Sequence, residues 1–442
     1  MSRKITVGAA LALALLMVAA SIPLTMIYAQ SRQNKLIRDL PSLVGKFNAL
    51  EEIQMKVNDN FFDEAADDAV NEAMVRGYIE GLKDPGSRYL SAEEYQSYME
   101  RLRGEAPELG ISLIYDPDLV GLVIDQVKAG SNAAVSGLRA GDHIVKAEAA
   151  GGRVLFNLPE VAPDKAAEEI EKFYAATAVG AVATETSSIS VTITYKRGGA
   201  YRPPANVMLG SSVLSLSSEM INAYAKPGDE PEKNIGYIKI YHFFQNTASQ
   251  LEAAVKDLSN KGAVSFIIDV RGCNEGDLES VCKAIDLFAY VPQDTGTIVS
   301  VRRRDGSFEP HPSTASNMIS YGKIAVLIDR RTSGVAELFA YDLRAFNNGK
   351  VFLVGEPTLG LSTIQEPFPL SRVGGAALLT IGTAVPYGVA EKDYATWNSE
   401  GVQPNVPTDE EVALGIIYRY SAAEQQLSGA VDVLSKPREA EE

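Results

Sequence analysis

The feature that most constrains this chain is the alternation of apolar strand-like runs with helical segments between residues 210 and 420. Runs rich in Ile, Val and Leu predict strands, and the segments between them carry apolar residues at helical spacing. The predicted strands are 235–240, 264–270, 324–328, 351–354 and 378–381, and the predicted helices are 247–258, 278–287 and 335–346. Such alternation predicts an α/β core in which helices cover the faces of the sheet.

The first 30 residues carry a membrane signal. Arg3 and Lys4 precede residues 5–29, which hold no charged side chain. A helix of this length, rising ~1.5 Å per residue, can cross a hydrocarbon layer ~30 Å thick. We therefore expect residues 1–30 to be a single-pass anchor in the cell membrane, with the bulk of the chain outside the cytoplasm. A cleaved signal peptide with its site near Ala20 is the alternative, and it would make the chain a secreted protein.

Two further regions lie between this segment and the α/β core. Residues 31–104 hold apolar side chains at helical spacing and predict a helical lead-in, with a turn over 83–90 and then a capping box at Ser91 and Glu94. Residues 105–209 change to short β-runs separated by glycine turns, which predicts a small β domain. The polar and acidic residues 421–442 are expected to be a frayed tail.

The composition of the chain argues against several kinds of functional site. The chain has three His and two Cys and lacks the H-E-x-x-H and C-x-x-C patterns, so neither a metal site nor a cofactor is expected. A net charge of −16 argues against a nucleic-acid partner, which would require a basic surface. Cys273 and Cys282 could form a disulfide outside the cell, and two partly buried thiols are the alternative.

Three motifs follow one another in a fixed order. Residues 82–95 read LKDPGSRYLSAEEY, residues 130–144 contain GSNA and SGLRAGDHI, and residues 401–406 read GVQPNV. In this order they resemble the C-terminal processing peptidases, also called tail-specific proteases, which are exported serine peptidases. The resemblance covers residues 45–410. It implies an α+β fold composed of a helical lead-in, a PDZ domain over 105–209 and a peptidase core over 210–420.

The resemblance also implies a particular chemistry. The family's nucleophile is the second Ser of G-[ST]-A-S-A-[SA]-E, and its general base is the Lys of G-x-x-T-x-G-K-G-x-x-Q. A lysine ammonium buried beside the serine would titrate low enough to accept the hydroxyl proton, and the glutamine would hold the lysine in place. Backbone N–H groups, including one from a D-L-R-x-N-P-G-G loop, would stabilise the oxyanion.

This chain retains the surroundings of these motifs but lacks their reactive side chains. The nucleophile position falls on Gly334 and the base position on Leu361, whereas the glutamine is present as Gln365. Glu275 occupies a glycine position of the oxyanion loop, where a carboxylate would oppose a developing negative charge. We therefore expect a pseudopeptidase. The alternative is an active endopeptidase that uses Ser333, one residue before Gly334, or another surrogate nucleophile.

A second motif concerns binding. The consecutive residues Leu109, Gly110, Ile111, Ser112 and Leu113 resemble the carboxylate-binding loop of the family's PDZ domain. Such a loop turns backbone N–H groups toward a peptide carboxylate while the peptide adds to the sheet as a strand; an ordinary strand opening is the alternative. The resemblance thus implies polypeptide C-termini or unstructured proteins as partners. A homo-oligomer or an active relative would be a further partner.

Overall fold

The structure is a computed structural model of the 442-residue chain. It describes residues 48–435 apart from 64–66, 85, 106–107, 117, 129, 150–151, 158–168, 171, 175–189, 210–214, 223–233, 290, 292–295, 315–318, 348, 387, 389–398 and 409–415. The membrane segment predicted over residues 1–30 lies outside this range, as do residues 31–47 of the lead-in. Within the described part of the chain, no helix combines the length and apolar character needed to cross a bilayer.

The chain divides into two compact units, Met1–Met74 and Val75–Glu442. In the first unit, residues 48–60 are helical and α2 (Asp67–Glu80) begins. The helices predicted here from the apolar spacing are thus present, although apolar side chains such as Ile53 and Phe62 are exposed. In the second unit, the last turn of α2 contributes Ile79, which packs in a small apolar cluster with Tyr89 and Ala377.

The main body of the second unit is a six-stranded sheet with the order β18-β15-β14-β11-β10-β9. Its strands are β9 (Leu216–Asn222), β10 (Asn234–Ile240), β11 (Ser265–Asp269), β14 (Ile324–Ile328), β15 (Val351–Gly355) and β18 (Val406–Pro407). Neighbouring strands pair in parallel, apart from the antiparallel pair β9 and β10. Parallel strands require crossover connections over the sheet faces. The α/β core predicted from the sequence is therefore confirmed.

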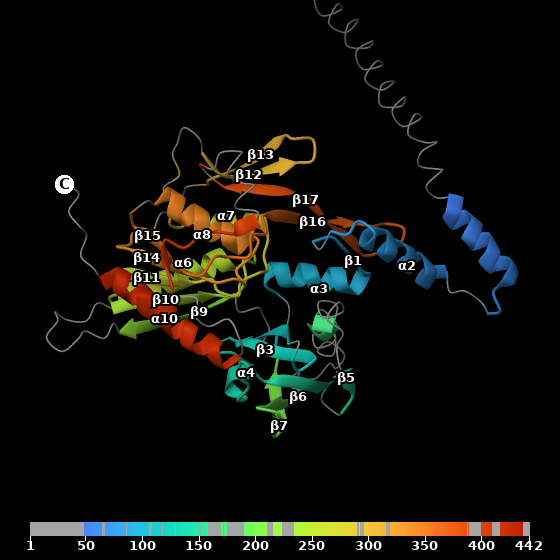
Figure 1. Cartoon of the computed structure of the whole chain (residues 1–442), viewed down its shortest axis with the longest axis horizontal. Coiled ribbons are helices and arrows are strands. Elements are labelled where there is room, and N and C mark those ends of the chain that lie inside the picture. The colour runs from blue at the N-terminus through green and yellow to red at the C-terminus, as the bar shows by residue number, and fades with distance from the viewer. Residues whose placement is uncertain are drawn as a thin grey trace, which may run out of the picture. The chain divides into compact units, whose positions relative to one another are not determined.

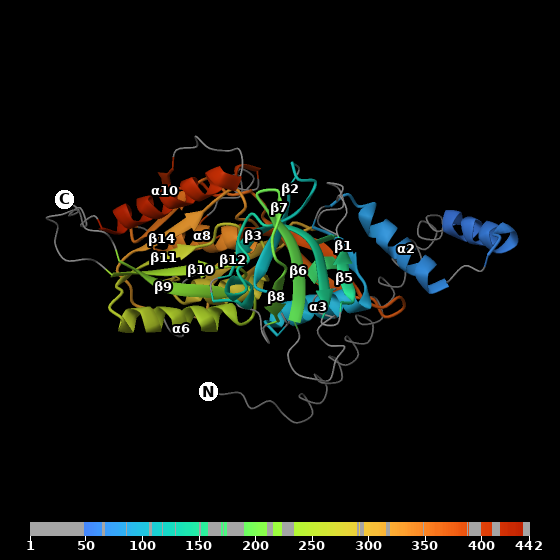
Figure 2. The ribbon, with the colours of Figure 1, turned by 90° about the horizontal axis from the view of Figure 1, so that it is seen from below.

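Helices cover both faces of this sheet (Figures 1 and 2). One face carries α6 (Thr247–Asn260), α7 (Leu278–Asp286) and α8 (Val335–Phe346), and the other carries α10 (Ile416–Ser435). Successive strand residues point to opposite faces. Ile268 accordingly packs in the cluster that contains α6, α7 and α8, whereas its neighbour Ile267 packs in the cluster that contains α10.

Helix α10 corrects the prediction for the carboxyl-terminal tail. Residues 421–442 were expected to be frayed, but residues up to Ser435 continue α10. Ala430 and Leu434, one helical turn apart, are 0% and 4% exposed against the sheet. Leu427 and Val431 of the same helix also pack against this cluster, so α10 carries an apolar stripe. Its burial becomes apparent only when the sheet face that it covers is known.

The second unit also contains a seven-stranded sheet, called the β domain below, with the order β2-β3-β4-β6-β7, in which β5 pairs with β4 and β8 with β6. Its elements are β2 (Ile111–Asp116), β3 (Gly121–Val127), α4 (Asn132–Val135), β4 (His143–Ala149), β5 (Val154–Asn157), β6 (Ser190–Arg197), β7 (Ala200–Tyr201) and β8 (Ala205–Met208). The domain has its own apolar core, in which Leu122, Ile144 and Ile193 are fully buried. The β-runs predicted from the sequence lie in this sheet.

A five-stranded sheet completes the second unit. It has the order β1-β17-β12-β13, with β16 on β17. The strands are β1 (Arg88–Leu90), β12 (Thr297–Arg303), β13 (Phe308–Pro312), β16 (Thr363–Pro369) and β17 (Ala376–Pro386). Residues 83–90 were predicted to be a turn, but their last three residues form β1 because they pair with the distant β17. The next helix, α3 (Ala92–Arg103), begins with the predicted capping box of Ser91 and Glu94.

Asp269 ends β11 at the centre of a buried ion network. Its carboxylate accepts hydrogen bonds from the Arg271 guanidinium at 2.5 Å, the Lys239 ammonium at 3.2 Å and the Tyr237 hydroxyl at 2.7 Å. Arg271 also donates to the Gln426 side chain of α10 at 2.9 Å. Burial alone would raise the pKa of Asp269, but Arg271 and Lys239 hold it well below its ordinary value of 3.8.

We expect Asp269→Asn to lower the free energy of unfolding by about 3 kcal/mol, since two buried cations lose their counterion. In the wild type the lowered pKa gives a contribution that is fully present above pH 3.8 and is lost as the pH falls further. Urea unfolding at neutral pH and between about pH 4 and pH 2 measures both effects. Asp257→Asn, in an exposed pair with Lys261, is the control and should cost under about 0.5 kcal/mol. Equal acid sensitivity of wild type and Asp269→Asn would contradict this assignment.

Candidate active site

Three loops meet at the carboxyl edge of the parallel strands. They follow β11, β14 and β15, and they contain the three motif positions predicted from the sequence. The Ser333 N–H donates to the Cys273 carbonyl at 3.1 Å, which joins the first two loops. The Leu359 N–H donates to the Thr332 carbonyl at 3.1 Å, which joins the second and third loops. In open α/β sheets this edge is where ligands bind.

Gly334 lies at the sharp turn between the loop after β14 and helix α8. Its backbone angles, φ 62° and ψ −124°, belong to a region that glycine adopts far more readily than other residues. A Cβ built at this position would meet no atom within 4 Å, so a side chain here would point into open space. The turn therefore presents residue 334 at the start of a helix, as a strand-to-helix nucleophile turn does.

Glu337, in the first turn of α8, connects this turn to the third loop. Its fully buried carboxylate accepts from the Gly334 N–H at 2.9 Å and from the Leu361 N–H at 2.8 Å through the same oxygen. The other oxygen accepts from the Gly360 N–H at 2.7 Å and from the Thr358 hydroxyl. Burial raises the pKa of Glu337, and these four donors oppose that rise. The backbone at Gly334 and Leu361, the two positions predicted from the sequence to correspond to the nucleophile and the base, is thus held side by side.

The structure separates Leu361 from Gln365. Leu361 is next to residue 334 through its backbone, but its alkyl side chain can neither accept nor donate a proton. The Gln365 amide nitrogen donates to the Thr363 carbonyl at 3.3 Å and to the Thr363 hydroxyl at 3.0 Å, within β16. Gln365 therefore fixes its own strand rather than residue 361. The late motif supports the third loop, because the Val402 N–H donates to the Thr358 hydroxyl at 2.7 Å.

Glu275 points toward His242. Its carboxylate lies 3.4 Å from the His242 Nδ1, and its carbonyl accepts from the Phe243 N–H at 2.9 Å. The His242 ring stacks on Phe244 with a centroid separation of 4.8 Å. Burial, with nearby cations, lowers the pKa of His242 well below 6.5, so this imidazole is neutral at pH 7. Glu275 thus adds a negative charge to the loop that would need to donate to an oxyanion.

In a Ser-Lys mechanism, a lysine beside Ser333 would have to accept its proton. The two lysines nearest to Ser333 in sequence do not lie beside it. Lys323 and Lys350 immediately precede β14 and β15, so they lie at the amino edge of these parallel strands. Ser333 lies at the carboxyl edge and is 6% exposed. Ser362, beside Leu361, is 1% exposed, and its carbonyl accepts from the Ala384 N–H at 2.7 Å. Both serines are therefore buried, and neither Lys323 nor Lys350 lies at the sheet edge that carries Ser333.

Lys128 was missed by sequence reasoning. It follows β3 in the β domain, is 1% exposed, and its ammonium lies 2.5 Å from the Glu108 carboxylate. Burial lowers the pKa of Lys128, while the charges of Glu108 and Glu275 raise it. A buried lysine near the oxyanion-position glutamate is visible only after folding, because no sequence motif connects the two. Burial outweighs these charges, so the pKa of Lys128 lies below its ordinary value.

The two cysteines are free and buried. The disulfide alternative is therefore wrong for this structure, and the predicted thiols are present but more deeply buried than expected. Burial raises the pKa of Cys273 to about 12, so the thiol beside Ser333 is protonated at neutral pH. A protonated buried thiol is a poor nucleophile. Cys273 does not replace the missing hydroxyl.

The β domain contacts the same loops. The Arg331 guanidinium pairs with Asp125 of β3 and, at 2.9 Å, with Asp329. The Gln126 amide of β3 donates to the Arg271 carbonyl at 3.2 Å. Arg331 is three residues before Gly334, so an ion pair links the β domain to the nucleophile-position turn.

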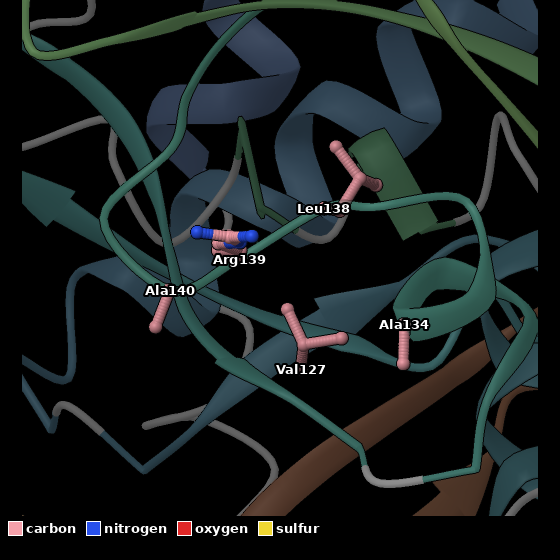
Figure 3. A pocket seen from close by; sticks show the side chains of 5 residues that line it. All are labelled: Val127, Ala134, Leu138, Arg139 and Ala140. Carbon is pink, nitrogen blue, oxygen red and sulfur yellow. The ribbon is translucent and has the colours of Figure 1, made fainter.

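The loop at residues 109–113 opens the β domain. The three apolar side chains Leu109, Ile111 and Leu113 are buried in the domain core. Gly110 has φ 81°, and a Cβ here would lie 2.3 Å from the Ser131 Cβ, so the chain requires glycine. Next to this loop is a cavity of about 500 Å³, lined by Val127, Ala134, Leu138, Arg139 and Ala140 (Figure 3). Val127 pairs with Ile111 across the sheet.

Comparison with known proteins gives consistent relationships. Residues 234–408 match the model for peptidase family S41. The carboxy-terminal processing protease CtpA of Bacillus subtilis is 25% identical over 321 residues, 72% of this chain and 61% of that protein. A carboxyl-terminal-processing protease of Picosynechococcus is 24% identical over 80% of this chain and 77% of that protein. This chain therefore spans less than two thirds of the Bacillus relative.

A solved structure shows the same fold. The photosystem II D1 C-terminal processing protease aligns with a TM-score of 0.50 and 20% sequence identity. The alignment covers 87% of this chain and 89% of that one. Identity at this level shows that the two folds are similar. The chemistry of this site has to be argued from its own residues.

Proposed function

Because this chain belongs to the C-terminal processing peptidases of family S41, we propose that it binds polypeptide C-termini and has lost peptide hydrolysis. The observation that carries the proposal is the geometry around Glu337. One carboxylate oxygen holds the backbone at both Gly334 and Leu361, so the frame of a Ser-Lys site is present without its serine and lysine. Glycine supplies no nucleophile and leucine no base.

Binding is proposed to occur in the β domain, which we interpret as a PDZ domain. The positive φ of Gly110 and the edge position of β2 support this interpretation. In this mode a peptide adds to the sheet edge, and its carboxylate meets backbone N–H groups of the preceding loop. The Asp125–Arg331 pair supports this proposal, because it joins the β domain to the loop that contains Gly334. A captured chain would there be held without being cut.

We further propose that residues 1–30 anchor the protein in the membrane with its bulk outside the cytoplasm. The uncharged run over residues 5–29 and the preceding Arg3 and Lys4 support this proposal. Captured polypeptides would then be extracytoplasmic, and the chain would act beside the membrane, as a homo-oligomer or with an active relative.

Peptide binding to the full-length chain tests the proposal. Two fluorescein-labelled Gly/Ser decapeptides that end in valine, one with a free carboxylate and one with an amide, serve as probes. We expect the free carboxylate to bind more tightly, and Gly110→Ala to weaken it by about tenfold, because the added methyl is strained and clashes with Ser131. Gly130→Ala is the matched control, since Gly130 also has a positive φ of 76° but open space around it. Equal binding of both peptides, or unchanged affinity in Gly110→Ala, would refute the binding site.

A further inference from the structure

We infer that the Tyr174 hydroxyl covers the strand edge on which a peptide would pair, so that a ligand must displace it. This inference rests on the proposed peptide-binding function and concerns the regulation of that site. It implies that, in the unliganded protein, Tyr174 blocks the strand edge to which a peptide would bind.

The covered edge belongs to β2. Among the described strands, β2 pairs only with β3 and so ends the sheet. The Leu113 N–H donates to the Tyr174 hydroxyl at 3.0 Å. The same hydroxyl donates to the Ile111 carbonyl at 3.4 Å. Tyr174 thus pairs with two backbone groups of an edge strand, where another strand would normally do so.

The chemistry of the contact resembles that of an added strand. A tyrosine hydroxyl both accepts and donates, as a peptide unit does. An incoming strand uses the alternate outward N–H and C=O groups of the edge that it extends. The Leu113 N–H carries a single hydrogen, and a peptide cannot receive it while Tyr174 does. Self-pairing and peptide pairing at this position therefore exclude each other.

Two contacts hold the Tyr174 ring in place. Its ring lies edge-on to Phe173, with centroids 5.8 Å apart, and Phe173 is fully buried in the β domain core. The Arg101 guanidinium lies over the same ring, 5.9 Å from its centroid. Arg101 belongs to α3, whose Leu102 carbonyl accepts from the Gln245 N–H of the α/β core at 2.9 Å. The position of the ring thus depends on both the β domain and α3.

The hydroxyl contact is displaceable because its bond to Ile111, at 3.4 Å, is longer than a strong hydrogen bond. When a ligand must first expose its site, its apparent affinity is reduced by the fraction of molecules in which the site is open. Tyr174→Phe keeps the ring and its packing but removes the hydroxyl. This variant should therefore bind the free-carboxylate decapeptide about three- to tenfold more tightly, the effect of one neutral hydrogen bond.

The experiment measures fluorescence anisotropy with the full-length chain and the free-carboxylate decapeptide. Tyr201→Phe is the control, because Tyr201 is 64% exposed on β7 and loses the same atom. Hydrogen exchange of the peptide segment that contains Leu113 gives a second readout, and exchange should be faster in Tyr174→Phe without ligand. Tighter binding together with faster exchange supports the inference.

The opposing outcomes are distinct. If the wild type binds the peptide and Tyr174→Phe binds it equally or more weakly, the Tyr174 hydroxyl does not block the β2 edge. The proposed function would then remain intact. Unchanged exchange at Leu113 would also overturn the inference, since the hydroxyl would then protect nothing. If neither wild type nor variant binds either decapeptide, the proposed function fails, and the inference fails with it.

Discussion

If the chain is a pseudopeptidase as proposed, introducing three side chains should give it peptidase activity. The variant combines Gly334→Ser, Leu361→Lys and Glu275→Gly. Glu337 already holds the backbone at residues 334 and 361, and a Cβ at 334 meets open space, so the new serine and lysine would begin from adjacent positions. We expect cleavage of an unfolded casein substrate to exceed that of the wild type by roughly 10³- to 10⁶-fold, since loss of a nucleophile or its base costs serine peptidases factors of this size.

The controls separate this expectation from an active wild type. A fluorophosphonate probe should label the triple variant and leave both the wild type and Ser333→Ala unlabelled. Gly334→Ser alone should remain inactive because leucine cannot accept the hydroxyl proton. It should also lower the free energy of unfolding by about 1–3 kcal/mol, the cost of a non-glycine residue in strained backbone. Wild-type cleavage that disappears in Ser333→Ala would establish the surrogate nucleophile instead.

Replacement of Glu337 should produce the largest loss of stability among single changes near the site. Glu337→Leu leaves three backbone N–H groups and the Thr358 hydroxyl without their acceptor in a buried place. Each unsatisfied buried donor costs about 1–3 kcal/mol before relaxation and water entry. We therefore expect the free energy of unfolding to fall by about 4 kcal/mol, measured as a shift of the urea midpoint at constant slope.

Two further variants test whether the loss of stability comes from the lost acceptor oxygens. Glu337→Gln retains one acceptor oxygen and should cost about half as much. Glu279→Leu is the matched control, because Glu279 is also in the first turn of a helix but is largely exposed and pairs with Lys283. Its cost should remain within about 0.5 kcal/mol. A loss in Glu337→Leu no greater than that of Glu279→Leu would show that the four donors find water instead.

The α/β core was predictable because its signals are local. Helix α8 occurs over the predicted residues, and the buried strands β11 and β14 are continuous apolar runs that two-sided burial requires. The grouping of the motif loops at one sheet edge follows from parallel topology. Gly334 and Leu361 could likewise be recognised as non-reactive residues from their identities alone.

The remaining features depend on distant partners. Strand β1 is three residues long and forms only because β17 is available. The burial of Ala430 in α10 and the pairing of Lys128 with Glu108 require contacts that no local pattern encodes. Glu337 was visible as a motif residue, but its role became clear only when its two oxygens were seen to join separate loops.

The hydrogen bonds accepted by Glu337 affect how such a site can change in evolution. Their donors are backbone amides and the Thr358 hydroxyl, and none belongs to a side chain at residue 334 or 361. The hydrogen bonds that hold the turn therefore do not depend on the side chains that would react there. Mutations at the two reactive positions can accumulate while the fold remains under selection for another task. A site built in this way can lose its reaction in one step and keep its architecture.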